Sequence, residues 1–200
     1  MRRISWWVLL LLALSESALA QTRIFVSGDA FADHKRFSGN ATESTLDVTG
    51  AGGGGGVGAQ VSDRWDVRGE VQVGSTTTIT EALLPPVTAF QSRSRNRITA
   101  YSALVGYSPA VTSRVRFTVL GGVSFLHVKT EVGSIPAGLV IVERTSIDNV
   151  ASPTVGVEVP IMIGSNFAVV PALRVQPFEL HTDGTNGFAI RPGVAVRWIQ

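Results

Sequence analysis

Cysteine is absent from the 200-residue sequence. This absence excludes a small secreted domain held together by disulfides, and it excludes any metal site built from thiolates. Charged residues are also scarce, at 16% of the chain, and the formal net charge is only +2. The arginines are scattered among acidic residues and form no clustered basic face, so no nucleic-acid partner is predicted.

Long apolar runs are equally rare. After residue 20, no stretch approaches the roughly 20 apolar residues of a transmembrane helix. The one dense run, "WWVLLLLAL" at 6–14, follows Arg2 and Arg3 and precedes "ALA" at 18–20. This order predicts a cleavable signal peptide over 1–20 and a mature domain over 21–200, with a retained membrane anchor as the alternative. A mature membrane protein without helices has to be a β-barrel.

Helical periodicity is nearly absent from the mature chain, whereas period-2 alternation recurs. In "RWDVRGEVQV" at 64–73, Trp65, Val67 and Val71 share one face, and the charged residues share the other. The pattern predicts an all-β fold: an eight-stranded antiparallel up-and-down transmembrane β-barrel. The eight strands are expected at 23–37, 50–61, 64–76, 95–108, 113–130, 146–163, 166–180 and 187–199.

The predicted connections alternate between short and long. The short ones are 62–63, 108–112 and 164–165, and the long ones are 38–49, 77–94, 131–145 and 181–186. Short periplasmic turns and longer extracellular loops are the pattern of outer-membrane barrels. Most of the strands exceed the roughly 9–11 residues that cross a bilayer, so several should project beyond it.

The polar face of these strands is predicted to fill the lumen. An eight-stranded barrel has an interior that side chains just fill, and buried charges have to be paired. If Ile24 and Ala30 face outward, then Asp29 and Asp33 face inward with the other charges. The predicted lumen charge network contains Arg64, Asp66, Arg68, Glu70, Arg114, Arg116, Glu158, Arg174, Arg191 and Arg197.

The apolar face is predicted to contact lipid, with aromatic residues near the two membrane surfaces. The lipid-facing and girdle residues are Trp65, Tyr107, Phe117, Phe125, Phe167 and Trp198. The structural alternative is a soluble secreted barrel of the lipocalin kind, in which the same valine-rich face would line a cavity for an apolar ligand. The sequence leaves both arrangements open at this point.

Five consecutive glycines, Gly52 to Gly56, interrupt the predicted strand at 50–61. A linker would have no second domain to connect, and a phosphate-binding loop would need a following Lys-Ser/Thr and a helix. We therefore favour a strand whose missing side chains make room for a bulky neighbour such as Phe31 or Trp65. A flexible loop is the alternative.

Several segments together resemble the small eight-stranded outer-membrane barrels, the OmpA/OmpX-like β-barrel superfamily. They are "GGGGGVGAQVSDRWDVRGEVQVG", "YSALVGYSP", "RFTVLGGVSFLHVKT" and the closing "GFAIRPGVAVRW". The resemblance implies an outer-membrane location, a filled lumen and a role in envelope integrity or surface adhesion, and the family includes a few enzymes. It also implies contact with outer-membrane lipid and with the barrel-assembly machinery. In this family, the machinery recognises an aromatic residue at the C-terminus. Here Trp198, two residues before Gln200, would be that residue.

Candidate catalytic and metal-binding residues are few. His34 with Asp33, and His181 with Asp183, offer two ligands each, fewer than zinc requires, so we predict no metal site and no cofactor. His127 shares the lipid-facing side, but its neighbours Val128 and Lys129 offer no nucleophilic hydroxyl. We therefore predict a non-enzymatic protein with a structural, envelope or surface-interaction role, its loops contacting an extracellular or envelope partner. The alternative is a narrow outer-membrane pore for small solutes.

Overall fold

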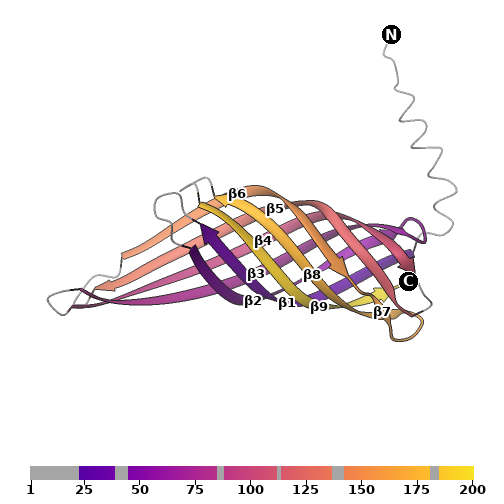
Figure 1. Ribbon diagram of the computed structural model, residues 1–200, viewed down its shortest axis with the longest axis horizontal. Coiled ribbons are helices and arrows are strands. Elements are labelled where there is room, and N and C mark those ends of the chain that lie inside the picture. Colours follow the sequence, from indigo (N-terminus) through magenta and orange to yellow (C-terminus); the bar gives the residue numbers. More distant parts are fainter. Residues whose placement is uncertain (1–22, 39–44, 85–87, 112–113, 137–141, 181–184) are drawn as a thin grey trace, which may run out of the picture.

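The computed structural model describes residues 23–38, 45–84, 88–111, 114–136, 142–180 and 185–200. The predicted signal peptide at 1–20 lies outside these ranges. Every regular element among the described residues is a β-strand. These residues include no helix that is long and apolar enough to span a bilayer. The strands wrap into an elongated barrel (Figure 1).

Neighbouring strands pair antiparallel in the order β6-β5-β4-β3-β2-β1-β9-β8-β7, and an additional β6–β8 pairing closes the sheet. The strands are β1 (Arg23–Ser38), β2 (Thr45–Gln60), β3 (Trp65–Leu84), β4 (Thr88–Val111), β5 (Arg116–Pro136), β6 (Val142–Glu158), β7 (Ile161–Met162), β8 (Phe167–Leu180) and β9 (Thr185–Ile199). Because consecutive strands are neighbours, the topology is up-and-down.

β6 and β7 are two parts of one barrel strand. The predicted strand at 146–163 is interrupted at Val159 and Pro160, because proline has no N–H to donate to the sheet. Hydrogen bonds still carry the strand across the gap: the Val159 N–H donates to the Pro171 carbonyl at 3.0 Å, and the Met162 N–H donates to the Arg114 carbonyl at 2.9 Å. Counting β6 and β7 as one gives the closed eight-stranded barrel that the alternation predicts.

The long connections are shorter than the sequence suggested. Most of the predicted loops at 77–94 and 131–145 is strand, with β3 and β4 in register as far as Leu84 opposite Thr88. β2 likewise begins at Thr45, and β9 begins at Thr185. The prediction of loops was wrong here because β-branched runs such as "TTTIT" at 76–80 favour strand, which outweighed the nearby prolines as a signal.

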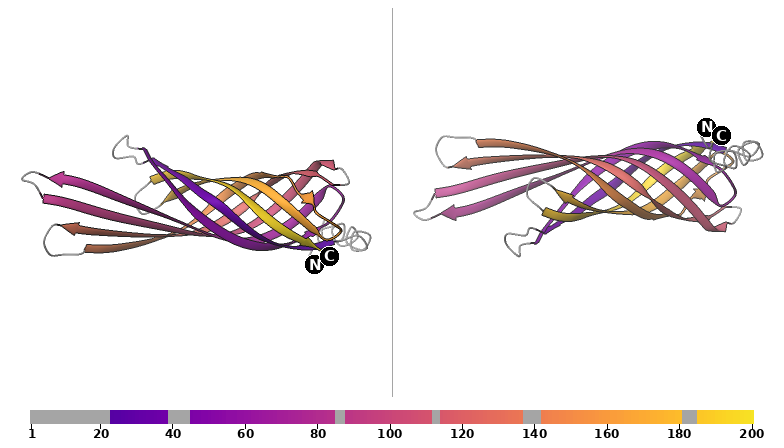
Figure 2. Two further views of the ribbon diagram at one scale, coloured as in Figure 1. Left: turned by 90° about the horizontal axis from the view of Figure 1, so that it is seen from below. Right: turned by 90° about the horizontal axis from the view of Figure 1, so that it is seen from above.

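Four strands extend beyond the closed barrel. The β2–β3 pairing ends at Ala51 opposite Ser75, and the β6–β8 pairing ends at Val155 opposite Val175. Beyond these points, within the described ranges, β3, β4, β5 and β6 pair only with one another. Figure 2 shows the two resulting hairpins reaching past the rest of the molecule. We call residues 76–84, 88–96, 130–136 and 142–146 the projecting sheet.

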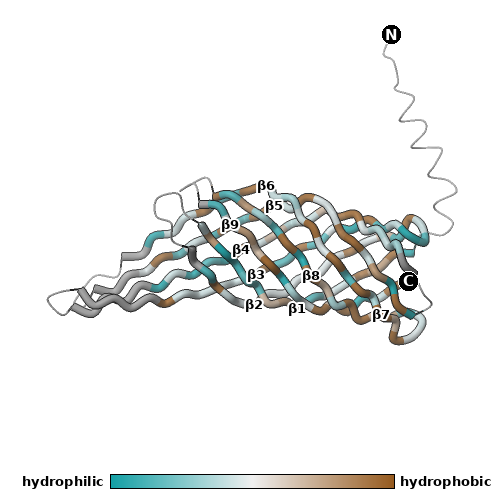
Figure 3. The backbone as a smooth tube through the Cα atoms, in the orientation of Figure 1, coloured by the Kyte–Doolittle hydropathy of each residue, from teal (hydrophilic) through white to brown (hydrophobic). Residues whose placement is uncertain are grey.

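The two faces of the barrel differ in polarity, and hydropathy alternates along the strands (Figure 3). Outward-facing Val71 and Val123 are 44% and 59% exposed, whereas inward-facing Ser124 is completely buried. The apolar face therefore lies outside and the polar face inside. This arrangement overturns the soluble alternative, which needed the valine-rich face to line a cavity.

The glycine run is part of β2, as we favoured. A Cβ at Gly54 would lie 2.8 Å from an Asp29 carboxylate oxygen, and a Cβ at Gly56 would lie 2.7 Å from Glu70 Cγ. At Gly52 the added atom would collide with the Phe31 ring. The alternate glycines thus leave the lumen volume to side chains of β1 and β3, which is the role predicted for Phe31.

Candidate functional site

The lumen holds a cluster of ion pairs centred on Glu158 of β6. Its carboxylate accepts hydrogen bonds from Arg68 at 2.7 Å, from Arg197 at 2.8 Å and from Arg174 at 3.0 Å. The three arginines come from β3, β9 and β8, so this one carboxylate connects strands on different sides of the barrel. Glu158 is 1% exposed, and its charge is therefore balanced by protein groups.

Two further carboxylates complete this cluster. Asp66 accepts a hydrogen bond from Arg68 Nε at 2.8 Å, and Glu70 binds Arg174 through both of its oxygens. Two guanidinium groups contact the face of the Phe25 ring, with Arg197 4.5 Å and Arg68 5.3 Å from its centre. Cation–π contacts of this kind are stronger when water is excluded.

A second polar layer lies nearer the projecting sheet. Arg191 donates to Asp33 at 3.0 Å and also to Gln176, and Lys35 pairs with the other Asp33 oxygen at 2.9 Å. Gln176 in turn donates to Ser124 and Thr154 at 2.9 and 3.0 Å. In this layer, hydrogen-bonded hydroxyl and amide groups fill the lumen together with the ion pairs.

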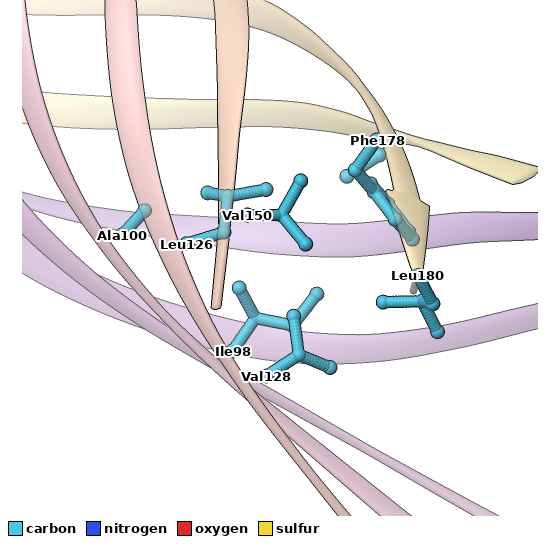
Figure 4. Close-up of a cluster of buried hydrophobic side chains, with 8 residues drawn as sticks. Ile98, Ala100, Leu126, Val128, Val150, Phe178 and Leu180 are labelled. Atoms are coloured by element: carbon cyan, nitrogen blue, oxygen red, sulfur yellow. The ribbon is translucent and has the colours of Figure 1, made fainter. Parts of the chain in front are cut away.

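An apolar cluster closes the lumen beyond this second layer. It contains Ile98, Ala100, Leu126, Val128, Val150, Phe178, Leu180 and Ala189, all buried, with Phe37 packed against them. Figure 4 shows these side chains converging from several strands. The rings of Phe37 and Phe178 meet edge to face at 5.7 Å. We call this cluster the apolar plug. The alternation of polar and apolar residues did not predict it, because a uniformly polar lumen was expected.

Among the described residues, the lumen is open at the end with the short turns. A cavity of about 390 Å³ there is lined by residues that include Arg23, Phe25, Arg114, Arg116 and Arg197. Between the two polar layers, a void of only about 10 Å³ borders Gln72, Arg174 and Arg191. The cavity is therefore a vestibule that ends at the ion pairs.

The structure separates the ten residues of the predicted lumen charge network. Asp66, Arg68, Glu70, Glu158, Arg174, Arg191 and Arg197 are buried inside the barrel. Arg64 and Arg114 are exposed, and Arg116 is half-buried at the mouth of the vestibule. Placing these three in the buried network was wrong, because they lie at or before the first residues of β3 and β5, at the rim where side chains reach water.

Lys35 is a member of the lumen that sequence reasoning missed. It lies two residues after Asp33 on β1 and is fully buried. With Lys35 included, the buried charged side chains among the described residues are five cations and five carboxylates. The predicted lumen set had seven arginines against five carboxylates, counting Asp29 and Asp33, whereas the buried set is balanced. Continuing the β1 alternation past Asp33 would have identified this lysine.

The outward face carries the predicted aromatic residues. Trp65, Phe117, Phe125, Phe167 and Trp198 are 41–53% exposed. Tyr107 packs on Trp65, with their ring centres 4.7 Å apart. Along β5 and the residue that precedes it, the outward apolar residues run from Val115 to Phe125. This is a height of about 25 Å for a tilted strand, which matches the apolar band of an outer-membrane barrel.

A collar of polar side chains follows this apolar band on the side of the projecting sheet. It contains His34 and Thr49 on β1 and β2, and Thr99, His127 and Asn149 on β4 to β6. Hydrogen bonds join His34 to Thr49 at 2.9 Å and His127 to Asn149 at 2.8 Å. Thr99 lies opposite His127, but the described side chains include no hydroxyl hydrogen-bonded to that ring. This placement supports an interfacial role for His127.

The two weak metal hypotheses have different outcomes. His34 faces outward and Asp33 faces the lumen, so the two side chains cannot share an ion. His181 and Asp183 lie outside the described residues. Within the described ranges, no group of three or more histidines and carboxylates is placed to hold a metal.

Comparisons with known proteins agree with this architecture. Residues 7–194 match the family profile of the outer membrane protein beta-barrel domain. No curated protein matches the chain. A major outer membrane protein from Thermus thermophilus superposes with a TM-score of 0.52 at 12% identity, over 88% of this chain and 99% of that one.

Two more solved structures align with this chain over most of their length. Neisserial surface protein A has a TM-score of 0.48 at 15% identity, over 88% of this chain and 96% of its own. Ail, the attachment invasion locus protein of Yersinia pestis, has a TM-score of 0.47 at 14% identity, over 87% and 98%. At such low identity, a structural likeness concerns the fold alone.

Proposed function

The chain belongs to the outer membrane protein beta-barrel family, and from this premise we propose that it is a closed, non-catalytic barrel that presents the projecting sheet for interactions at the cell surface. The observation that carries the proposal is the sheet itself. The pairing of β3 with β4, β4 with β5 and β5 with β6 continues well past the closed barrel. Unpaired strand edges of this kind bind extended peptides by adding a strand.

Shortening the sheet tests this proposal. Cells carrying the full chain would be compared with cells in which residues 78–94 and 132–144 are each replaced by a two-residue Asn-Gly turn. We expect the shortened barrel to keep its heat-dependent gel mobility and to lose adhesion to protein-coated surfaces. If adhesion persists while cells lacking the whole barrel become sensitive to detergent, the role is structural and does not involve the sheet.

The pore alternative is disfavoured by the filling of the lumen. An ion entering from the vestibule would meet the Glu158 cluster, then the Asp33 layer and finally the apolar plug. An apolar constriction excludes ions by dewetting. We therefore expect no stepwise conductance from the purified protein in planar bilayers, and discrete channels that survive repurification would support the pore instead.

A non-catalytic role is supported by the surroundings of His127. Its ring is hydrogen-bonded to an amide oxygen of Asn149, and acyl transfer would require a hydroxyl within reach of the other ring nitrogen. The discriminating assay is hydrolysis of phospholipid vesicles by the wild type and by His127→Asn. Hydrolysis by the wild type that is lost in His127→Asn would show an enzyme.

A further inference from the structure

Three arginines occupy alternate positions on the outward face of β4, just beyond the polar collar. They are Arg93, Arg95 and Arg97, and all three are exposed. The strand register places Arg97 opposite Lys129 of β5 and Arg95 opposite Glu131. We call Arg93, Arg95, Arg97 and Lys129 the basic stripe.

The basic stripe carries a clear excess of positive charge. Lys129 Nζ lies 2.6 Å from a Glu131 oxygen. This hydrogen bond, followed by the attraction of Lys129, Arg95 and Arg93, lowers the pKa of Glu131, which therefore stays ionised near neutral pH. No other carboxylate among the described side chains pairs with the stripe, so within this described set four cations face one anion.

Among the described side chains, the excess lies on one side of the barrel. On the opposite side, Arg36 stands at the equivalent level, one outward position beyond His34. It binds Asp47 through two hydrogen bonds, of 2.7 and 2.9 Å. That cation is therefore neutralised, and the positive field is concentrated over β4 and β5.

The near end of the stripe, Arg97 and Lys129, lies closest to the lipid headgroups. Arg97 lies four residues from Tyr101 on β4, which is about 10 Å along the membrane normal for a tilted strand. The headgroup layer is roughly 5–7 Å thick on each side of the hydrocarbon core. Arginine side chains can fold back along the surface so that the guanidinium group reaches this layer. Directly below, exposed Tyr101 and Phe125 form the surface that acyl chains contact.

A shallow cleft next to the stripe adds a fifth cation. It measures about 280 Å³ and is lined by Arg93, Arg95 and Arg144, together with Glu131, Val132, Gly133 and Thr145. The position of a Cβ at Gly133 would be open, with no atom within 4 Å, so the floor of the cleft is unobstructed. One guanidinium group can bind two phosphate oxygens at once through two parallel N–H donors.

We propose that the basic stripe binds the phosphate group of an anionic lipid in the outer leaflet and thereby holds the base of the projecting sheet at the membrane surface. A lipid is favoured over a free anion because only the polar collar separates the stripe from the apolar band that contacts acyl chains. The proposal goes beyond the surface-interaction role, since it requires no partner for the tip of the sheet.

Native mass spectrometry of the full chain in a neutral detergent tests this site. The probes are dioleoyl phosphatidic acid, which carries an exposed phosphate, and dioleoyl phosphatidylcholine, which has no net charge. We expect Arg97→Gln to weaken phosphatidic acid binding about fivefold, and the triple Arg93, Arg95 and Arg97→Gln variant to weaken it on the order of a hundredfold. The matched control Arg36→Gln, at the same level on the paired side, should bind as the wild type does.

Heat-dependent gel mobility of each variant would verify that the barrel is folded. Arg97→Lys should retain most of the binding, because the site requires charge at that level. Equal losses in Arg36→Gln and Arg97→Gln, or equal binding of the two lipids, would overturn the proposal. Displacement of phosphatidic acid by millimolar inorganic phosphate would identify a free-anion site and would overturn the assignment to lipid.

Discussion

At the residue scale, the inward-facing glycines of β2 determine what the lumen can contain. A Cβ at Gly58 would lie 2.8 Å from Arg68 Cβ and would also collide with the Phe25 ring. Strand propensity by itself favours alanine over glycine, so a loss of stability on substitution would have to come from this crowding.

We therefore expect Gly58→Ala to destabilise the barrel by about 1–3 kcal/mol, the range for overpacking a filled interior. The matched control is Gly121→Ala on the outward face of β5, where an added Cβ meets no atom within 4 Å. Urea titrations followed by gel mobility would measure both changes. A Gly58→Ala barrel as stable as Gly121→Ala would contradict the tight packing of the lumen.

Among the charged residues, Glu158 is expected to contribute most to the stability of the barrel. Replacing it with Gln leaves Arg68, Arg174 and Arg197 without the carboxylate that all three bind. Removing one partner of a buried ion pair costs about 3–5 kcal/mol, whereas an exposed pair contributes about 0–1 kcal/mol. We expect Glu158→Gln to unfold at much lower urea concentration than Glu131→Gln, which removes the exposed pair with Lys129. Equal midpoints would show that the Glu158 cluster does not stabilise the fold.

The inward facing of several of these residues can be predicted from the sequence, and each correct or wrong prediction has a physical reason. Asp66, Arg68 and Glu70 lie within a strictly alternating strand, so their facing is determined by period 2. Arg64 and Arg114 have the same parity but precede the strands, at the rim where side chains are exposed and need no partner. The Glu158 contacts join strands far apart in the sequence, and alternation carries no information about which strands face each other across a lumen.

At the element scale, the apolar plug shows that the inward-facing residues of one strand change from polar to apolar along its length. On β5, Ser124 faces the second polar layer, and Leu126 and Val128 face inward directly after it. On β4, Ser102 is likewise followed toward the sheet by inward-facing Ala100 and Ile98. A prediction that assigns one polarity to each face of a strand misses this change. The change is nevertheless visible in the sequence, because the inward positions of neighbouring strands become apolar at the same level.

The plug should contribute to stability as a soluble core does. Leu126→Ala removes a side chain that is 1% exposed, and substitutions of this kind in a packed core cost about 2–5 kcal/mol. Leu173→Ala makes the same chemical change at an outward position that is 41% exposed. We expect the inward substitution to lower the midpoint in urea more than the outward one does. The reverse order would mean that the plug is loosely packed.

At the scale of the whole molecule, the position of the barrel in the bilayer follows from its two polar boundaries. The collar of His34, Thr49, Thr99, His127 and Asn149 marks one boundary, and the short turns mark the other. Trp65 and Trp198 are both exposed near the turns, where amphipathic rings favour the membrane–water interface. If residues 1–20 are removed as a signal, these are the only two of the four tryptophans left in the chain.

Tryptophan fluorescence can therefore measure the depth of one rim without any added label. We expect the chain beginning at Gln21, refolded into phosphatidylcholine vesicles, to be quenched most strongly by lipids brominated near the headgroup and least by those brominated near the chain end. Trp65→Phe and Trp198→Phe should each remove part of the emission and leave this order unchanged, because both rings lie at the same rim. Strongest quenching at the chain end would place the turns inside the hydrocarbon and would displace the basic stripe from the opposite headgroup layer.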